Sequence, residues 1–225
     1  MNSLNGRALR SNVLGTIALA ALLFVPAGTL HYWQAWVFMA IFIGATTGIT
    51  VYLAIRDPAL LERRMKAGPA AEGETTQKII MGIAMTGFLA AIVVPALDHR
   101  FGWSAVPVGL ALFGDALIAL GFLFVFFVLR TNTYGASTIQ IAEGQTVIST
   151  GPYAMVRHPM YAGAVALLAG VPLALGSWWG LLPLMVLLPA LIWRLLDEER
   201  FLIGNLPGYA EYRKQVRQRL LPFIW

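Results

Sequence analysis

Six runs of apolar residues divide the chain, and polar stretches separate them. Runs of this length and composition predict an all-α, multi-pass integral membrane bundle of about five or six helices. The segment 161–176 is about 24 Å long at the helical rise, which is short for a hydrocarbon core of about 30 Å. We therefore expect it to cross with little tilt or to enter only part way. The six segments are 13–30, 33–54, 79–97, 105–129, 161–176 and 178–196.

Composition supports a membrane protein. Hydrophobic residues make up 58% of the chain and charged residues only 12%, whereas soluble domains are nearer a quarter charged. The absence of cysteine excludes disulfides, thiolate metal ligands and a cysteine nucleophile. The net charge of +5 comes from residues beside apolar segments, which favours anionic lipid headgroups over nucleic acid as the partner.

The distribution of Lys and Arg predicts the orientation of the helices. If the N-terminus is cytoplasmic, 15 of the 16 Lys and Arg residues fall on the inner side and only Arg100 falls outside. This asymmetry places the C-terminus, with the polar segments 130–160 and 194–225, on the cytoplasmic side, where the two segments can meet. The 55–78 connection is interpreted as a solvated loop, and Asp115 in the fourth segment is expected to pair within the bundle.

The first candidate for chemistry is the stretch GPYAMVRHPMYAG at 151–163. Proline is accepted in the first turn of a helix, so His158 is expected at a helix entrance with Tyr161 on the same face. Gly163 leaves room on that face for a ligand or for another helix.

The second candidate is WRLLDEERFL at 193–202. Arg194 and Glu198 are four residues apart and share one helix face. Asp197, Glu198 and Glu199 point in successive directions, so at most two of them can face the first stretch. An ordinary surface ion pair at a helix exit is the simpler alternative, worth only some tenths of a kcal/mol.

Several common motifs are missing. The chain has no HExxH, GxSxG or P-loop pattern, and no GxGxxG follows a strand, which argues against a zinc site, a serine hydrolase and a Rossmann domain. A cofactor must therefore lie in a pocket made by membrane helices and their inner connections.

The motifs RHPMYAG at 157–163 and EERFL at 198–202, followed by LPGYAEY at 206–212 and a closing LPFIW, resemble the isoprenylcysteine carboxyl methyltransferase family and the related phospholipid methyltransferases. The resemblance covers about residues 130–225. It implies N-terminal transmembrane helices over 1–130 and a catalytic region over 131–225, with a helical hairpin and a cytoplasmic C-terminal helix.

The resemblance also implies S-adenosylmethionine as cofactor, in a pocket formed by the loop and the C-terminal segment. Glu198 would bind its methionyl ammonium, and Arg194 occupies the place of the substrate-binding arginine. The remaining cofactor residues implied by the match are Gln140, Gln145, Thr146, Val147, Ile148, Tyr153, His158, Pro159, Met160 and Tyr161.

A lipophilic carboxylate is the favoured acceptor because it is ionised at neutral pH and needs no general base. Arg194 could hold and aim such a group. A lipid amine or thiol is the alternative, and it would require His158 or Glu199 as a base. Two other classes remain open: a nicotinamide-dependent sterol-type reductase and a non-enzymatic membrane protein. The expected partners are a lipophilic substrate and membrane lipids, without nucleic acid or metal.

Overall fold

The computed structural model describes residues 3–222 and 225, and over these residues it confirms the all-α prediction. Phe223 and Ile224 of the closing LPFIW motif lie outside the described residues. The α-helices are α1 (Leu4–Ala27), α2 (Trp33–Arg56), α3 (Pro58–Met65), α4 (Thr75–Phe101), α5 (Val108–Thr131), α6 (Pro159–Ala174), α7 (Leu184–Asn205) and α8 (Tyr209–Gln215). Short 3-10 turns occur at η1 (Pro69–Ala71), η2 (Gly151–Ala154) and η3 (Trp179–Leu181).

The long helices are those of a multi-pass membrane protein. Within the described residues, five helices are long and apolar enough to cross a membrane: α1, α2, α4, α5 and α7 together with η3. The sixth apolar helix, α6, has only 16 residues. Many large apolar side chains on these helices are exposed, as a surface facing lipid requires.

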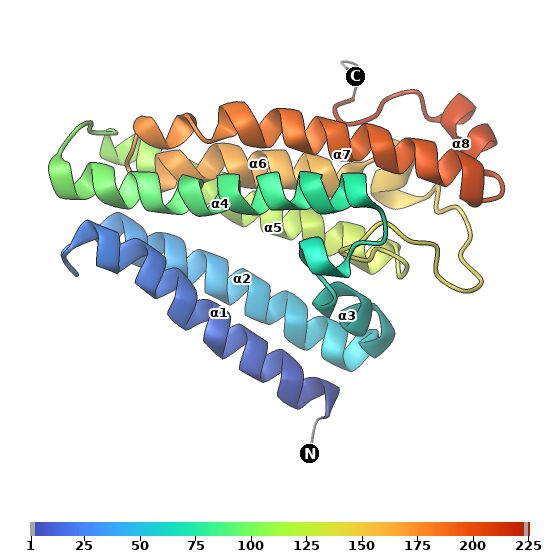
Figure 1. Cartoon of the computed structure of the whole chain (residues 1–225), viewed down its shortest axis with the longest axis horizontal. Helices are drawn as coiled ribbons and strands as arrows, with labels where there is room; N and C mark the ends of the chain where they lie inside the picture. Colours follow the sequence, from blue (N-terminus) through green and yellow to red (C-terminus); the bar gives the residue numbers. More distant parts are fainter. Residues whose placement is uncertain (1–2, 223–224) are drawn as a thin grey trace.

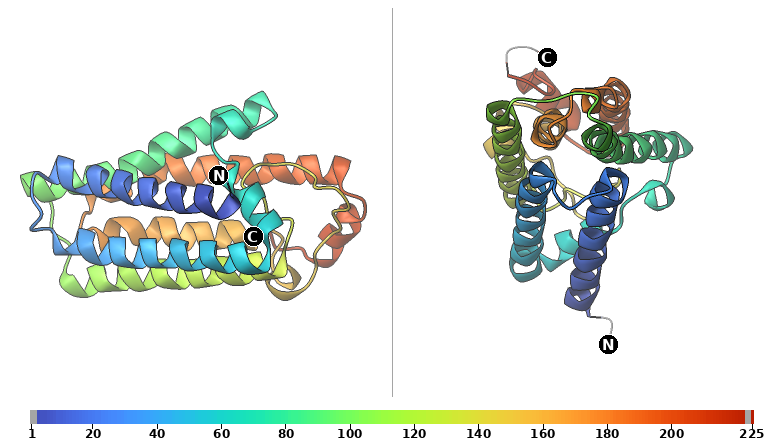
Figure 2. Two further views of the ribbon diagram at one scale, coloured as in Figure 1. Left: turned by 90° about the horizontal axis from the view of Figure 1, so that it is seen from below. Right: turned by 90° about the vertical axis from the view of Figure 1, so that its left-hand side faces the viewer.

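The helices form two unequal layers, with α1 and α2 in one and α4 to α7 in the other (Figure 1). Short connections at 28–32, 102–107 and 175–183 lie at one end of the bundle, which we call the turn end. The long connections 57–74 and 132–158 and the C-terminal segment 206–222 lie at the opposite end, which we call the loop end (Figures 1 and 2). The two polar stretches identified in the sequence therefore share the loop end.

Helix α6 reaches the turn end despite its length. The buried Asp98 carboxylate of α4 accepts hydrogen bonds from the Ser104 backbone N–H at 2.7 Å and from the Ser177 hydroxyl just beyond α6. The Tyr32 hydroxyl donates to the Leu175 carbonyl at 2.6 Å. These bonds tie the three turns together, so α6 extends between the two ends of the bundle.

Helix α6 packs very closely on α5. A Cβ on Gly114 would lie 2.4 Å from the Ala174 backbone nitrogen, and one on Gly163 would lie 2.6 Å from a methyl of Val125. Gly121 and Gly170 are similarly crowded. The space that Gly163 leaves on its helix face is therefore filled by α5, one of the two occupants that the sequence allowed.

Two sequence expectations are wrong in detail. The last membrane helix was expected over 178–196, but α7 begins at Leu184 and continues to Asn205, because the chain first makes the η3 turn and passes Pro183. Asp115 was expected to pair within the bundle. It is buried, yet neither carboxylate oxygen has a hydrogen-bond partner among the described residues.

Candidate functional site

A polar cavity of about 320 Å³ opens at the loop end. Its walls come from the 132–148 connection, from η2, from the start of α6, from the last turns of α7 and from α8. The volume lies at the lower end of the range for small-molecule sites. The side chains that matter most for its chemistry are Tyr153, Tyr161, Arg194, Glu198, Tyr209 and Tyr212.

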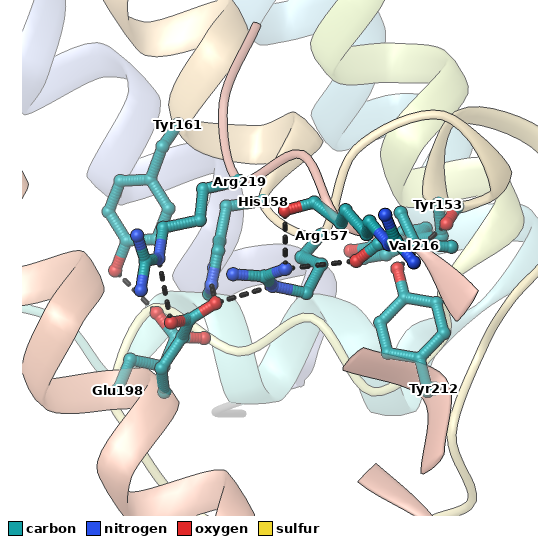
Figure 3. A network of polar contacts seen from close by, with 10 residues as sticks. Tyr153, Arg157, His158, Tyr161, Glu198, Tyr212, Val216 and Arg219 are labelled. Atoms are coloured by element: carbon teal, nitrogen blue, oxygen red, sulfur yellow. Dashed lines mark hydrogen bonds and ion pairs between the residues drawn. The ribbon is translucent and has the colours of Figure 1, made fainter. Parts of the chain in front are cut away.

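Glu198 is the acidic residue that lines this cavity. The half-buried carboxylate accepts a hydrogen bond from the Tyr161 hydroxyl at 2.5 Å and forms no salt bridge within the described residues. Figure 3 shows the Tyr161 ring reaching from α6 toward Glu198. A half-buried carboxylate in this position is suited to bind a cationic group of a ligand.

Arg194 lies one helical turn before Glu198 and lines the same cavity. Its guanidinium donates to Gln77 Oε1 at 2.9 Å, to Glu72 Oε1 at 2.7 Å and to the Ser137 carbonyl at 3.0 Å. The arginine is thus oriented from three sides. Its nearest carboxylate is Glu72 rather than Glu198, the partner that the helical spacing suggested.

Glu72 is a site residue that the sequence did not reveal, as are Gln77, Tyr209 and Tyr212. It belongs to the 66–74 connection, part of the segment interpreted as a solvated loop, and that interpretation is wrong for this residue. Its side chain is only 1% exposed, and Oε2 also accepts a bond from the Ile139 backbone N–H at 3.2 Å. No periodic pattern marks a contact between a loop and a helix 122 residues apart.

Glu199 points away from the polar cavity into a cluster of basic groups. Its Oε1 accepts from Arg157 Nε at 2.6 Å and lies 3.3 Å from His158 Nε2, while Oε2 accepts from Arg219 Nε at 3.0 Å. The prediction of Glu199 as a base has no support from this geometry, because the side chain is buried among its partners and does not line the cavity.

The same cluster holds the end of the chain in place. The backbone N–H groups of Arg157 and His158 donate to the carbonyls of Gln218 and Arg219, both at 2.9 Å. The Arg157 guanidinium also donates to the carbonyls of Val216 and Arg217, at 2.9 and 2.7 Å. Residues 216–220, which we call the C-terminal strap, therefore lie against the RHP motif.

Tyrosines form much of the wall beside the strap. Tyr153 accepts a hydrogen bond from Asn132 at 2.8 Å, and its backbone carbonyl accepts from the Tyr212 hydroxyl at 2.7 Å. Burial raises the pKa of Tyr153 to about 12, and the Asn132 bond opposes that rise only in part. Burial likewise raises the pKa of Tyr209 and of Tyr212. These phenols stay neutral at physiological pH and offer flat faces for a stacked ring.

A second, apolar cavity of about 360 Å³ lies in the middle of the bundle. Side chains from α2, α4, α5, α6 and α7 surround it, among them Phe42, Phe88, Phe122 and Leu187. Tyr161 and Arg194 line both this cavity and the polar one. They therefore stand between a polar compartment at the loop end and an apolar compartment among the membrane helices.

The structure brings most of the predicted site residues to one place. Arg194 and nine of the predicted cofactor residues line the polar cavity: Gln140, Gln145, Thr146, Val147, Ile148, Tyr153, Met160, Tyr161 and Glu198. His158 and Pro159 are buried at the start of α6 behind that wall. In residues 3–222 and 225, no group of three His, Asp or Glu side chains is placed to hold a metal ion.

One family of known proteins matches part of the chain. Residues 110–206 match the family model described as phospholipid methyltransferase. This confirms the relationship to phospholipid methyltransferase-like membrane methyltransferases, and it supports methyltransferase activity. The matched region contains most of α5, all of α6 and α7, and both candidate motifs. A search of curated proteins finds no match to the chain.

Proposed function

We propose that the protein is a membrane-embedded, S-adenosylmethionine-dependent methyltransferase that methylates the carboxylate of a lipophilic, isoprenylcysteine-like substrate. The observation that carries this proposal is the position of Arg194 and Tyr161 between the polar and the apolar cavity. A cofactor from the aqueous side and a lipid from the bundle interior would meet at these two side chains.

The residues that line the polar cavity suit S-adenosylmethionine, because they include one carboxylate and several tyrosine rings. Glu198 would bind the methionyl ammonium, and the tyrosine faces together with the backbone of the 140–148 segment would hold the adenosine. When bound, the cofactor supplies an electrophilic methyl group on a sulfonium. Residues 131–225 would form the catalytic region, with His158 and Pro159 supporting Met160 and Tyr161 from behind.

Arg194 would position the acceptor. A carboxylate already carries the lone pair that attacks the methyl carbon, so no proton has to be removed. A guanidinium presents donors in a fixed planar fork and can aim one carboxylate oxygen along the line of displacement. Glu199 is not required as a base, and we assign it the role of positioning the RHP motif and the strap.

N-methylation of a lipid amine is the second candidate. Two observations favour it: the family match is to phospholipid methyltransferases, and Arg194 is already paired with Glu72. An ammonium would find Glu198 and Glu72 near the junction of the cavities, but it has to lose a proton before it can attack. The carboxylate remains the simpler acceptor chemically.

We also propose that the loop end faces the cytoplasm. All Lys and Arg residues other than Arg100 lie at the loop end or on the flanking segments nearest to it, and cytoplasmic flanks of membrane helices are enriched in these residues.

Calorimetric titration of the protein in detergent with S-adenosylmethionine and, separately, with NADPH tests the cofactor. Binding of S-adenosylmethionine alone is expected, and binding of NADPH alone would eliminate the proposal. Transfer of a labelled methyl group to N-acetyl-S-farnesylcysteine, compared with phosphatidylethanolamine, then separates carboxyl from amine methylation.

A further inference from the structure

The 66–74 connection, which we call the Glu72 loop, places a single buried side chain inside an otherwise solvated segment. Every other residue from 66 to 74 is exposed or half-buried, whereas the Glu72 side chain is 1% exposed. Gly68 has a φ of 91°, a conformation that favours glycine, and Gly73 directly follows Glu72 with no atom near its Cβ position. The loop is therefore anchored mainly through one carboxylate.

The Glu72 carboxylate is already bound to the Arg194 guanidinium, which is the group that the proposed substrate requires. Arg194 has three acceptors, and two of them, Gln77 and the Ser137 carbonyl, are neutral. Glu72 is the anionic acceptor, at 2.7 Å. A substrate carboxylate arriving from the apolar cavity therefore meets an arginine whose charge is already balanced.

If the substrate carboxylate replaces the Glu72 carboxylate, the partly buried Arg194 guanidinium always keeps an anionic partner. Retention of both would place two anions on a single arginine, which is unfavourable. Glu72 is the acceptor able to leave, because Gln77 lies within α4 and Ser137 contributes only a backbone carbonyl. Departure of Glu72 also releases the Ile139 N–H, which belongs to a residue on the wall of the polar cavity.

We propose that Glu72 occupies the substrate-carboxylate position on Arg194 when no substrate is bound. The carboxylate of an incoming substrate displaces Glu72 from Arg194 and thereby frees the Glu72 loop. This inference rests on the proposed carboxyl methylation. It makes Glu72 a specificity-determining residue, since a lipid without a carboxylate lacks the group that replaces it. It also links substrate binding in the apolar cavity to the wall of the cofactor cavity.

The chain contains no cysteine, so a spin label on Ala70→Cys, an exposed position of the Glu72 loop, is unique. Labelled protein is titrated with N-acetyl-S-farnesylcysteine and with palmitate, and with their methyl esters as controls. The acids should increase label mobility and the esters should not. In Glu72→Gln the label should be mobile without ligand, and the acids should bind about tenfold more tightly, as when the competent state is one-tenth populated beforehand. Glu74→Gln, a change of the exposed acid two residues away, should behave like the unmodified protein.

Three outcomes would overturn the inference. If the acids are methylated while the label stays immobile, Glu72 is a fixed tie and only this inference fails. If Glu72→Gln weakens binding of the acids, Glu72 assists the substrate and does not compete with it. If S-adenosylmethionine binds but neither acid is methylated or moves the label, the proposed acceptor fails together with the exchange.

Discussion

Glu198 and Glu199 are neighbours in the chain, yet their carboxylates serve different sides of α7. Glu198 receives the Tyr161 hydroxyl at the polar cavity, whereas Glu199 receives Arg157 and Arg219 at the C-terminal strap. Successive helical residues differ by about 100° in direction, so one acidic pair can reach a ligand and fix the surrounding wall at the same time. The two acids should therefore respond differently to substitution.

Replacement of Glu198 should weaken cofactor binding. Glu198→Gln removes the negative charge but keeps the shape, and loss of one charge-assisted contact of about 2 kcal/mol corresponds to roughly thirtyfold in affinity. Isothermal titration with S-adenosylmethionine measures the change. Glu211→Gln, which alters an exposed acid paired with Lys214, is the matched control and should leave the affinity unchanged.

Replacement of Arg194 should separate binding from turnover. Arg194→Ala should retain S-adenosylmethionine affinity and lose methyl transfer, because the arginine is assigned to the acceptor. The substitution strands the buried Glu72 carboxylate, so the double variant Arg194→Ala with Glu72→Gln should recover any lost thermal stability without regaining activity. Loss of cofactor affinity in both variants would contradict this division of roles.

Replacement of Glu199 should destabilise the loop end. Glu199→Gln leaves the buried Arg157 without its anion, and breaking a buried pair costs about 3–5 kcal/mol. Thermal unfolding in detergent should show a lower Tm, and trypsin should cut the C-terminal strap faster. Arg7→Gln breaks the exposed pair with Glu62 and should change stability by less than about 1 kcal/mol. A Tm for Glu199→Gln equal to that of Arg7→Gln would show that the cluster does not hold the strap.

Small substitutions in the contact between α5 and α6 should also be costly. A methyl group on Gly114 would lie 2.4 Å from a backbone atom of Ala174, and overpacking of this kind costs about 1–3 kcal/mol. Gly114→Ala should therefore lower the Tm. Gly109→Ala in the same helix has no atom within 4 Å of the new methyl and should leave the Tm unchanged or slightly raised. Equal stability of the two variants would argue against close packing of these helices.

The sequence predicts the membrane helices well because lipid imposes a one-dimensional pattern of long apolar runs. The sequence also predicts that 151–163 and 193–202 lie at the same end of the bundle. Two membrane crossings separate these segments, and an even number of crossings returns the chain to the side from which it started. Helix ends are less well predicted. The extension of α7 to Asn205 carries a charged segment beyond the apolar run, and hydropathy alone ended the helix at 196.

Contacts of individual polar side chains were harder to predict. His158 was expected on the cofactor wall, but as the residue before the first turn of α6 it faces Glu199. The partnership of Glu72 with Arg194 depends on how the 66–74 connection folds back over α7, which no local spacing encodes. For Asp115 the error is the reverse: its depth in an apolar helix predicted a polar partner, but the described residues provide none.

The close glycine contact between α5 and α6 limits where a lipid can enter the apolar cavity from the bilayer. Backbones that approach this closely leave no gap through which an alkyl chain could slide, so that flank of the apolar cavity is a sealed wall. Helices α2 and α4 supply Phe42 and Phe88 to the cavity, and over the described residues α1 packs against both of these helices. A lipid exchanging with the membrane between α2 and α4 would have to pass α1, so movement of α1 would control its exchange.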